Sequence, residues 1–265
     1  MAIITLTTDL GIEDFYLSAV KGRILNALDE NVTIVDISNQ IKIFDIRNAA
    51  YVLKNSFENF PKGTIHIVGV DSEISIKRQA ILMEYKGHFF IGADNGLFSL
   101  IYDYPPTHFY ELHIDIDTNV LTFPTRDIFA KAACHLARGG TPEIIGKKIN
   151  QIVSFQKPVP QTQELFIRGS VTHIDSYGNA ITNISKKLFE EIGKSRSFNI
   201  GFRNYEVNKL CNTYSEVPEG VNLALFNTSG LLEIAINRGV EGYGGSASQL
   251  LGLTEDEIVT ITFNK

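Results

Sequence analysis

Hydrophobic positions in the first half of the chain alternate between two periodicities. Short runs of apolar and β-branched residues predict buried strands, and apolar residues three or four positions apart predict helices. The first run, residues 3–8, ends in a loop, Asp9-Leu10-Gly11, before a helical pattern begins. Repetition of this order predicts an α/β domain. The expected strands are 3–8, 32–37, 64–70, 80–85, 88–92 and 107–112, and the expected helices are 12–25, 44–57 and 128–136.

The helix expected at residues 12–25 has a recognisable apolar face and a charged start. Phe15 and Leu25 belong to the apolar face, which we expect to pack on the sheet. Glu13 and Asp14 fall in the first turn, where acidic side chains favour the positive end of the helix dipole. The pattern therefore predicts a helix that begins close to residue 12.

The pattern changes after Thr141. Residues 151–163 contain Pro158 and Pro160 and show no helical periodicity, so they are the best candidate for a linker. Beyond them the chain consists mainly of short predicted strands. We therefore expect an α/β protein: an N-terminal α/β/α domain with a central, mostly parallel sheet (1–155), and a smaller C-terminal β-barrel-like domain (156–265). The later expected strands are 165–174, 198–202, 205–207, 221–226, 232–237 and 257–263, with helices at 186–192 and 246–251.

Composition and charge narrow the functional class. The chain is 44% hydrophobic and 20% charged, as in ordinary globular proteins, and its net charge of −6 without a Lys/Arg run argues against a nucleic-acid partner. Two isolated cysteines, Cys134 and Cys211, favour a reducing compartment over a disulfide framework or a zinc site. No apolar run reaches membrane-spanning length, and residue 1 leads directly into a strand without leader-like features. We expect a cytoplasmic protein with no membrane partner.

Acidic residues follow two of the predicted strands. Asp9 stands at the carboxyl end of the first strand, where open α/β sheets bind ligands, although a carboxylate that caps the helix or the turn fits equally well. Asp71 follows the third strand, and Arg78 closes the polar excursion after it, so this pair can hold a water molecule or an anion. We interpret Asp94-Asn95-Gly96 as turn chemistry and Arg126-Asp127 as a structural ion pair or helix start.

Several short motifs, in this order, resemble those of the SAM hydroxide adenosyltransferases, the adenosine-forming hydrolases of S-adenosylmethionine (SAM) that are related to the fluorinase and chlorinase halogenases. Each motif alone is weak, but together they run along nearly the whole chain. They are Thr8-Asp9-Leu10-Gly11 with Lys21-Gly22, Phe60-Pro61-Lys62-Gly63-Thr64 leading to Asp71, Ala93-Asp94-Asn95-Gly96-Leu97, Thr122-Phe123 with Arg126-Asp127-Ile128-Phe129-Ala130, Ile174-Asp175, Tyr177-Gly178-Asn179, Thr182-Asn183, Asn227-Thr228-Ser229-Gly230 and Glu233-Ile234-Ala235.

The resemblance implies a reaction, an assembly and a substrate. It implies a homotrimer whose SAM sites lie at subunit interfaces, between the α/β domain of one subunit and the β domain of its neighbour. It also implies in-line attack of water or hydroxide on the ribose 5′ carbon, giving adenosine and L-methionine, with no metal or other cofactor. Because the leaving group is a neutral thioether, no general acid is needed; orientation and desolvation of the nucleophile carry the chemistry.

The resemblance also assigns residues. Asp9 matches the carboxylate that binds both ribose hydroxyls, for which its two oxygens are suited. Asp71 and Arg78 match two members of an Asp–Arg–His set that holds the nucleophilic water in the hydrolases. Other substrate-binding positions are Phe44 and Phe123 as aromatic walls, Asp175, Asn227, Thr228 and Ser229 at the methionine end, and Tyr177 and Asn179 at the adenine.

Two departures leave alternatives open. The family histidine falls on Pro124, whose side chain neither donates nor accepts, so Thr125 is the nearest replacement. The usual Asp-Pro-Gly-Val-Gly run is replaced by Asp71-Ser72-Glu73-Ile74-Ser75. The alternatives are a halogenase-type enzyme and a SAM- or adenosine-binding protein with impaired catalysis. Asp71 argues against the first, because the halogenases carry a tyrosine there and a carboxylate repels a halide.

Overall fold

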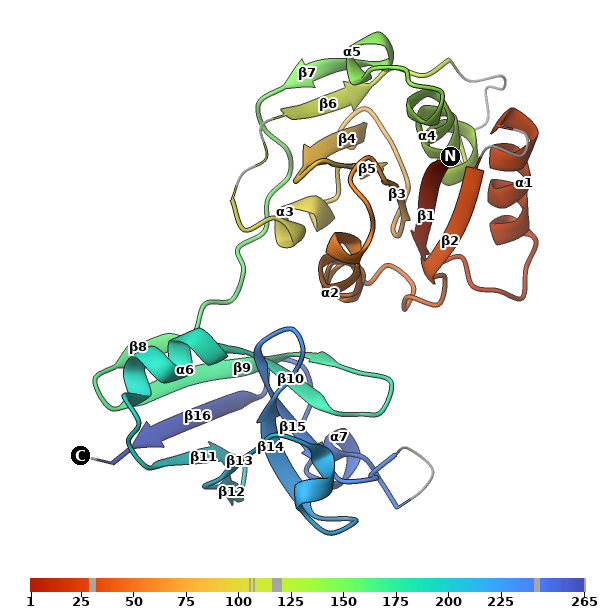
Figure 1. The fold of residues 1–265 in the computed structure, drawn as a ribbon. Helices are drawn as coiled ribbons and strands as arrows, with labels where there is room; N and C mark the ends of the chain where they lie inside the picture. Colours follow the sequence, from red (N-terminus) through yellow and green to blue (C-terminus); the bar gives the residue numbers. More distant parts are fainter. Residues whose placement is uncertain (29–31, 105, 107, 116–120, 241–243, 265) are drawn as a thin grey trace. The chain divides into compact units, whose positions relative to one another are not determined.

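The computed structural model describes residues 1–28, 32–104, 106, 108–115, 121–240 and 244–264. The chain forms two compact units, residues 1–156 and 157–265, which are described in turn (Figure 1). The elements of the first unit are β1 (Ala2–Thr8), α1 (Tyr16–Leu28), β2 (Val32–Ser38), α2 (Ile46–Ser56), η1 (Phe57–Asn59), β3 (Ile65–Gly69), β4 (Ala80–Tyr85), β5 (His88–Ala93), α3 (Leu97–Ile101), β6 (His108–Leu112), η2 (Thr125–Phe129), α4 (Ala130–Ala137), α5 (Pro142–Ile145) and β7 (Gly146–Ile149).

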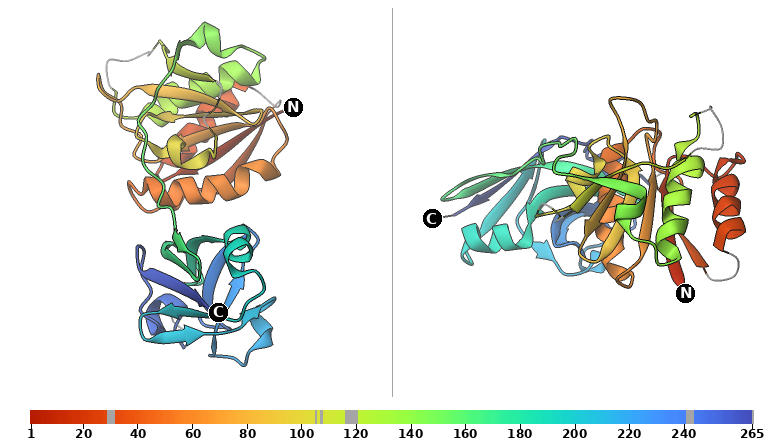
Figure 2. Two further views of the ribbon diagram at one scale, coloured as in Figure 1. Left: turned by 90° about the vertical axis from the view of Figure 1, so that its left-hand side faces the viewer. Right: turned by 90° about the horizontal axis from the view of Figure 1, so that it is seen from above.

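The first unit is a three-layer α/β/α structure. In its described residues a seven-stranded sheet has the order β2-β1-β3-β5-β4-β6-β7. Strands β2, β1, β3 and β5 pair in parallel, and the remaining pairs are antiparallel. One apolar core joins α1 and α4 to the sheet, and another joins α2 and α3 to it, on opposite faces (Figure 2). The predicted central sheet is therefore mixed, with five of seven strands running in one direction.

Strand β3 shows how the sequence builds both cores. Ile65 and Ile67 belong to the core under α1 and α4, whereas Val68 belongs to the core under α2 and α3. This alternation follows the two-residue period of a strand. A strand that is buried on both faces is typical of parallel sheets covered by helices, so β3 reads as a continuous apolar run.

Helix α1 begins later than its pattern predicted. It starts at Tyr16, so the prediction that Glu13 and Asp14 lie in its first turn is wrong. Phe15 and Leu25, expected on the buried face, are 62% and 50% exposed. The stripe that is buried consists of residues spaced by three and four, which places it on one face of a helix that starts one turn later. Its members are Leu17, Val20, Ile24 and Leu28.

The second unit is built almost entirely of strands. Its described residues form a nine-stranded sheet, ordered β12-β11-β16-β9-β10-β15-β14-β13, with β8 paired to β9. The elements are β8 (Gln161–Gln163), β9 (Phe166–Ile174), β10 (Ala180–Ser185), α6 (Lys186–Gly193), β11 (Phe198–Phe202), β12 (Tyr205–Val207), β13 (Leu210–Cys211), η3 (Tyr214–Glu216), β14 (Asn222–Phe226), β15 (Leu231–Ile236), α7 (Ala247–Leu250) and β16 (Ile258–Phe263).

Chain connectivity makes this sheet nearly a closed barrel. The strands at its two ends, β12 and β13, are joined directly, since β12 ends at Val207 and β13 begins at Leu210. Three residue steps span at most roughly 10–11 Å, so the two edges must curl toward each other. The predicted barrel-like architecture is therefore confirmed (Figure 1).

Some elements escaped prediction. Strand β10 contains the polar pair Thr182-Asn183 and was not expected as a strand. Oδ1 of Asn183 accepts the backbone N–H of Ser170, next to the position where the pairing of β10 with β9 shifts register. A polar side chain can therefore serve the strand pairing at an irregularity, which a period-two pattern does not reveal. Thr107, the first residue of the strand expected at 107–112, lies outside the described residues. None of the described helices is long and apolar enough to cross a membrane.

Candidate functional site

The order of the strands identifies a ligand-binding edge in the first unit. The chain leaves β1 through α1 to β2 on one side of it, and returns through α2 to β3 on the other side. The two connecting helices lie on opposite faces of the sheet. This reversal makes the carboxyl ends of β1 and β3 the topological switch point, the place where open α/β sheets bind ligands. Register places Thr8 beside Gly69, so the loops that follow both strands start side by side.

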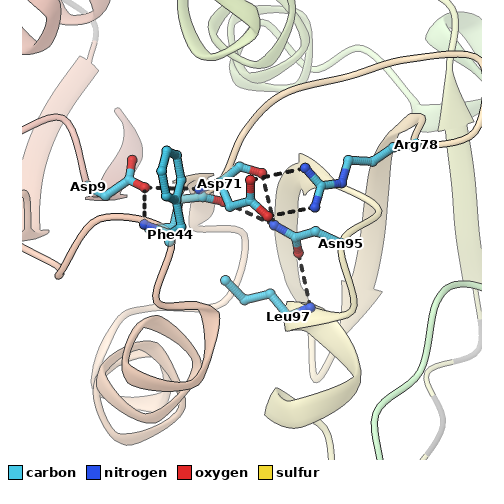
Figure 3. Close-up of polar contacts among 7 residues, drawn as sticks. Asp9, Phe44, Asp71, Arg78, Asn95 and Leu97 are labelled. Atoms are coloured by element: carbon cyan, nitrogen blue, oxygen red, sulfur yellow. Dashed lines mark hydrogen bonds and ion pairs between the residues drawn. The ribbon is translucent and has the colours of Figure 1, made fainter.

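Asp9 connects the loops that follow three strands. Its Oδ2 atom accepts the backbone N–H of Phe44, from the loop after β2, at 3.0 Å, and that of Asp71, from the loop after β3, at 3.1 Å (Figure 3). The carboxylate therefore bonds to neighbouring loops and not to the first turn of α1. Its Oδ1 atom accepts no hydrogen bond from the described residues and points away from these two amides.

The two residues that donate to Asp9 share an unusual backbone conformation. Phe44 has φ of 63° and Asp71 has φ of 44°, both in the left-handed region. Non-glycine residues there carry a strain of roughly 1–3 kcal/mol and are found where the surroundings hold them. The two hydrogen bonds that Oδ2 of Asp9 accepts help to keep both residues in this conformation. The Phe44 side chain is 71% exposed, and Figure 3 shows it next to the Asp9 carboxylate.

Asp71 and Arg78 form a bidentate ion pair. The Nη1–Oδ1 distance is 3.0 Å and the Nη2–Oδ2 distance is 2.6 Å, and the side chains are 23% and 31% exposed. A small hairpin presents the arginine, because the backbones of Ser75 and Arg78 exchange two hydrogen bonds. The pair predicted from sequence is thus present. It leaves carboxylate lone pairs and further guanidinium N–H groups for a water molecule.

Thr125, which follows Pro124, is more buried than Asp71 and Arg78. Thr125 is fully buried, and its hydroxyl has no hydrogen-bond partner among the described residues. It packs against Gly69 at the end of β3, and no hydrogen bond among the described residues joins its hydroxyl to Asp71 or Arg78. Thr125 also opens the π-helical turn η2, a feature frequent at functional sites.

Phe123 packs inside the first unit. It is only 9% exposed and meets the Tyr16 ring edge-on at 5.4 Å. The Arg126 guanidinium lies 5.0 Å from the Phe123 ring centre and forms a bidentate pair with Asp127. Our interpretation of Arg126-Asp127 as a structural ion pair is therefore confirmed.

In the second unit, Asp175 organises the turn between β9 and β10. Its Oδ1 accepts the backbone N–H groups of Tyr177 and Asn179, both at 2.9 Å, and its Oδ2 accepts Nδ2 of Asn179 at 3.2 Å. Gly178, with φ of 78°, packs so tightly on Ser246 that a Cβ atom would lie 2.3 Å from it. The turn is therefore tightly packed and hydrogen-bonded, and it leaves the Tyr177 side chain 63% exposed.

The turn between β14 and β15 is also held by its own polar groups. Oδ1 of Asn227 accepts the backbone N–H groups of Ser229 and Leu231, and Nδ2 of Asn227 donates to Oε2 of Glu233 at 3.2 Å. Glu233 is 3% exposed and also accepts the hydroxyl of Tyr214 at 2.7 Å. Burial raises the pKa of Glu233, and the charge of Asp175 raises it further, while the two hydrogen bonds act against this.

Comparison with known proteins assigns the chain to a family. Residues 4–146 match the SAM hydroxide adenosyltransferase N-terminal domain, and residues 169–260 match the SAM hydroxide adenosyltransferase C-terminal domain. The chain belongs to the SAM hydroxide adenosyltransferase family. The resemblance seen in the short motifs is therefore confirmed.

Individual relatives match along nearly the whole chain. The (R)-S-adenosyl-L-methionine hydrolase of Thermus thermophilus is 32% identical over 94% of both chains. The enzyme of the same name from Methanocaldococcus jannaschii is 32% identical over 97% of this chain and 95% of its own. A fluorinase of Nocardia brasiliensis is 26% identical over 89% of this chain and 90% of its own. The crystal structure of an uncharacterized conserved protein from Thermotoga maritima superposes with a TM-score of 0.87 at 28% identity, covering 98% of this chain and 99% of that one.

The structure brings the family positions together in three groups. In the first unit, Asp9, Phe44, Asp71 and Arg78 are joined by hydrogen bonds. Thr125 and Phe123 are buried, and no hydrogen bond among the described residues links their side chains to that network. In the second unit, Asp175, Tyr177 and Asn179 share one turn. The remaining group, Asn227, Thr228 and Ser229, forms another turn, whose exposed residues are Thr228 and Ser229.

Three residues that organise these groups were not predicted as site residues from the sequence. They are Asn95, which we interpreted as turn chemistry and which contacts the backbone of Asp71, Glu233, which appeared only within a motif and binds Asn227, and Tyr214, which binds Glu233. Glu233 carries a visible signal, since an acidic residue inside an otherwise apolar strand must find buried partners. Asn95 carries none, because an asparagine before a glycine is ordinary turn chemistry. Within the described residues, no three His, Cys, Asp or Glu side chains gather as metal ligands.

Proposed function

We propose that this protein hydrolyses SAM to adenosine and L-methionine. Water forms a bond to the ribose 5′ carbon while the bond from that carbon to sulfur breaks. The electron pair of the broken bond stays on sulfur, which turns the sulfonium into the neutral thioether of methionine. One proton from the water is released, so SAM and water give adenosine, methionine and a proton.

The observation that carries this proposal lies at the switch point of the sheet. There the Asp9 carboxylate accepts the backbone N–H of Asp71, whose own carboxylate is paired with Arg78. Relatives that share 32% identity over nearly their whole length are named (R)-S-adenosyl-L-methionine hydrolase. Together they support a site that orients a ribose and holds water beside it.

Asp9 and Asp71 have different tasks in this proposal. Oδ2 of Asp9 already accepts two backbone N–H groups, so Oδ1 is the atom left for the ribose hydroxyls, and its two lone pairs can accept both. The exposed ring of Phe44 supplies an apolar wall beside that oxygen. The pair of Asp71 and Arg78 orients the attacking water, and the carboxylate accepts its proton as the bond to carbon forms.

Thr125 is proposed as the third water-holding residue in place of the family histidine. Its buried hydroxyl has no partner among the described residues, which leaves it available to a bound water. The substrate-binding roles proposed for the second unit fall on Asp175, Tyr177, Asn179, Asn227, Thr228 and Ser229. Since the Oδ1 atom of Asn227 is occupied by its own turn, the exposed Thr228 and Ser229 are the better candidates for direct contact there.

The names of the relatives also direct attention to the sulfur. The sulfonium of SAM carries three different carbon substituents, so it is a stereocentre directly bonded to the reacting carbon. We propose that the chain prefers the (R) configuration, as the names of its relatives state for those proteins. A site that orients the carbon–sulfur bond for in-line attack places the methyl group differently in the two epimers.

Assembly, cofactor use and location complete the proposal. We propose a cytoplasmic homotrimer that works without a cofactor and binds SAM at subunit interfaces. Large apolar side chains are exposed on the loops that follow β1, β2 and β3, which supports an interface there, because apolar side chains exposed near one another favour association. They are Ile12 (63% exposed), Phe15 (62%), Ile43 (67%), Phe44 (71%) and Ile76 (96%). Light scattering coupled to size exclusion distinguishes a trimer from a monomer.

The deciding experiment incubates the purified protein separately with each sulfonium epimer and resolves the products by chromatography. We expect adenosine and methionine in equal amounts, faster from the (R) epimer. Parallel reactions with added fluoride, chloride or bromide test for a 5′-halogenated product. Tight binding of SAM in calorimetry without adenosine release contradicts hydrolysis and identifies a binding protein, and a halogenated product identifies a halogenase.

A further inference from the structure

Asn95 lies beneath the loop that carries Asp71 and bonds to it. Its Nδ2 atom donates to the backbone carbonyl of Val70 at 3.0 Å and to that of Asp71 at 3.1 Å (Figure 3). Its Oδ1 atom accepts the backbone N–H of Leu97, at the start of α3, at 3.1 Å. The side chain is 7% exposed. A buried carboxamide in this position therefore ties the end of β3 to the start of α3.

In Asp71 the backbone N–H, the backbone carbonyl and the carboxylate all form hydrogen bonds with other residues. Its backbone N–H is bound by Asp9, its carbonyl by Asn95, and its carboxylate by Arg78. Its backbone is in the left-handed region, with φ of 44°. A strained conformation persists only where its surroundings fix it. The carboxylate direction depends on that conformation, since the side chain of a residue turns with its backbone.

We propose that Asn95 is a positioning residue for Asp71, and this rests on the proposed function. Its two donated hydrogen bonds keep Asp71 in the left-handed conformation in which the carboxylate meets Arg78 and faces the 5′ carbon. Asn95 touches neither substrate nor water. It acts through Asp71, so its loss changes turnover more than substrate affinity.

A purely structural role for Asn95 makes a different prediction. The bond from its Oδ1 to Leu97 resembles a helix cap, and aspartate caps helices about as well as asparagine. Asn95→Asp keeps that acceptor but replaces the donating Nδ2 by an oxygen, which faces the carbonyls of Val70 and Asp71. A cap alone therefore tolerates Asn95→Asp, whereas a positioning residue does not.

We expect Asn95→Asp and Asn95→Ala to lower kcat about 10- to 100-fold and to change KM less than threefold, because a misplacement near 1 Å can cost 10²-fold in rate. The matched control is Asn237→Ala. Asn237 is also buried, at 9% exposed, and its Nδ2 donates to the carbonyl of Val217 in the second unit. We expect it to lower the melting temperature with kcat kept. If Asn95→Asp fails to fold, Asn95→Ala is compared with this control.

The decisive measurement is the crystal structure of the folded Asn95 variant. We expect Asp71 to leave the left-handed region and the bidentate pair with Arg78 to break. An unchanged Asp71 in that structure overturns the inference, as does wild-type kcat in Asn95→Asp. Absence of adenosine formation by the wild-type protein overturns the proposed function instead, and the crystal structure still tests Asn95.

Discussion

The backbone N–H of Asp71 donates a 3.1 Å hydrogen bond to Oδ2 of Asp9, which joins the loops of two adjacent parallel strands. The same oxygen accepts the backbone N–H of Phe44. One side chain therefore does two things: one oxygen shapes the loops, and the other is open toward the proposed substrate. Substitutions can separate these tasks.

Asp9→Asn and Asp9→Ala are expected to differ in turnover. The amide oxygen of asparagine can still accept both backbone N–H groups, but an NH₂ replaces the oxygen that faces the ribose. We expect Asp9→Asn to raise KM about tenfold with a small change in kcat. Asp9→Ala removes both oxygens, so it should raise KM and also lower kcat, because Asp71 loses an anchor. Steady-state adenosine formation measures both constants.

The control for this comparison is Asp36→Asn. Asp36 pairs with Lys21 on the surface, 2.6 Å apart, and its loss should leave kcat and KM unchanged. Equal kcat values for Asp9→Asn and Asp9→Ala would contradict the role of Oδ2 of Asp9 in shaping the loops.

Asp71→Asn should lower kcat with little effect on KM. The amide cannot accept the proton of the attacking water, and loss of a general base costs roughly 10²–10⁴-fold. Arg78→Lys should give a smaller loss, because lysine cannot form the bidentate pair. Adenosine release under saturating SAM measures the effect. Glu58→Gln, which breaks the exposed pair with Lys86, is the control and should be neutral. A change in KM alone would remove Asp71 from the chemistry.

The sequence predicted the site better where interacting residues lie close together in the chain than where they lie far apart. The pair of Asp71 and Arg78 was visible because acid and base flank one excursion of the chain. The role of Oδ2 of Asp9 was not visible, since it depends on Phe44 and Asp71, which lie 35 and 62 positions away. A residue pattern does not report such long-range backbone contacts.

The fold shows the same division. The apolar run of β3 and the alternation of its neighbours were sufficient for the α/β unit, because burial on two faces leaves a continuous apolar signal. The start of α1 was predicted wrongly, since Phe15 is apolar but exposed. Near a binding site or an interface, apolar residues can be exposed because they serve binding or association. Such residues do not mark the core, so a prediction from hydrophobic periodicity misplaces the start of the helix.

Gly69→Ala should disturb the site through Thr125. A Cβ atom at residue 69 would lie 2.8 Å from Cγ2 and 2.9 Å from Oγ1 of Thr125, and 3.2 Å from Cγ2 of Thr8. Thr125 is buried, so it cannot move into solvent, and overpacking of this kind costs roughly 1–3 kcal/mol of unfolding free energy. Denaturant unfolding measures the loss, and kcat should fall as well.

Two further variants test that explanation. Thr125→Ala removes both nearest atoms and should restore most of the unfolding free energy lost in Gly69→Ala. Gly22→Ala is the matched control, since a Cβ atom there meets nothing within 4 Å in the middle of α1, and it should be neutral or stabilising. A lack of rescue by Thr125→Ala would show that the strain lies elsewhere.

Stability should fall on the acid side because of His66. Its Nδ1 lies 2.7 Å from Oγ1 of Thr5, and its Nε2 lies 3.2 Å from Nδ1 of His88. Burial, and then the neighbouring His88, lower the pKa of His66 from 6.5 to about 3. Between pH 6.5 and about 3, His66 is therefore protonated in the unfolded chain but neutral in the folded chain. This contribution to stability is present above pH 6.5 and declines as the pH falls toward 3.

At pH 5 the loss from His66 amounts to about 2 kcal/mol relative to pH 8. Denaturant unfolding at a series of pH values measures it. His66→Gln should flatten the decline, although His88, whose pKa is also lowered by burial, leaves a remainder. His113→Gln is the control, because that side chain is 60% exposed beside Glu111. An equally steep decline in His66→Gln and the wild-type protein would exclude His66 as its source.

Tyr214→Phe should weaken the second unit most at high pH. Glu233, almost fully buried, would lose the 2.7 Å hydrogen bond from the tyrosine hydroxyl and keep only Nδ2 of Asn227. An unpaired buried acceptor costs roughly 1–3 kcal/mol of unfolding free energy. Burial already raises the pKa of Glu233 in the folded chain. Such a group favours folding below its unfolded pKa and opposes it as the pH rises through the folded value, so loss of a bond to the carboxylate is felt where it is ionised.

Denaturant unfolding of Tyr214→Phe at pH 5 and pH 8 therefore should show the larger deficit at pH 8. SAM affinity, measured by calorimetry, should also fall. Glu233, held by one side-chain hydrogen bond instead of two, fixes less firmly the Asn227 amide that shapes the turn of Thr228 and Ser229. Tyr205→Phe is the matched control: its hydroxyl donates a long 3.4 Å bond to the carbonyl of Leu250 and its side chain is 40% exposed. A deficit of equal size at both pH values would mean that the hydroxyl supports packing and not the Glu233 carboxylate.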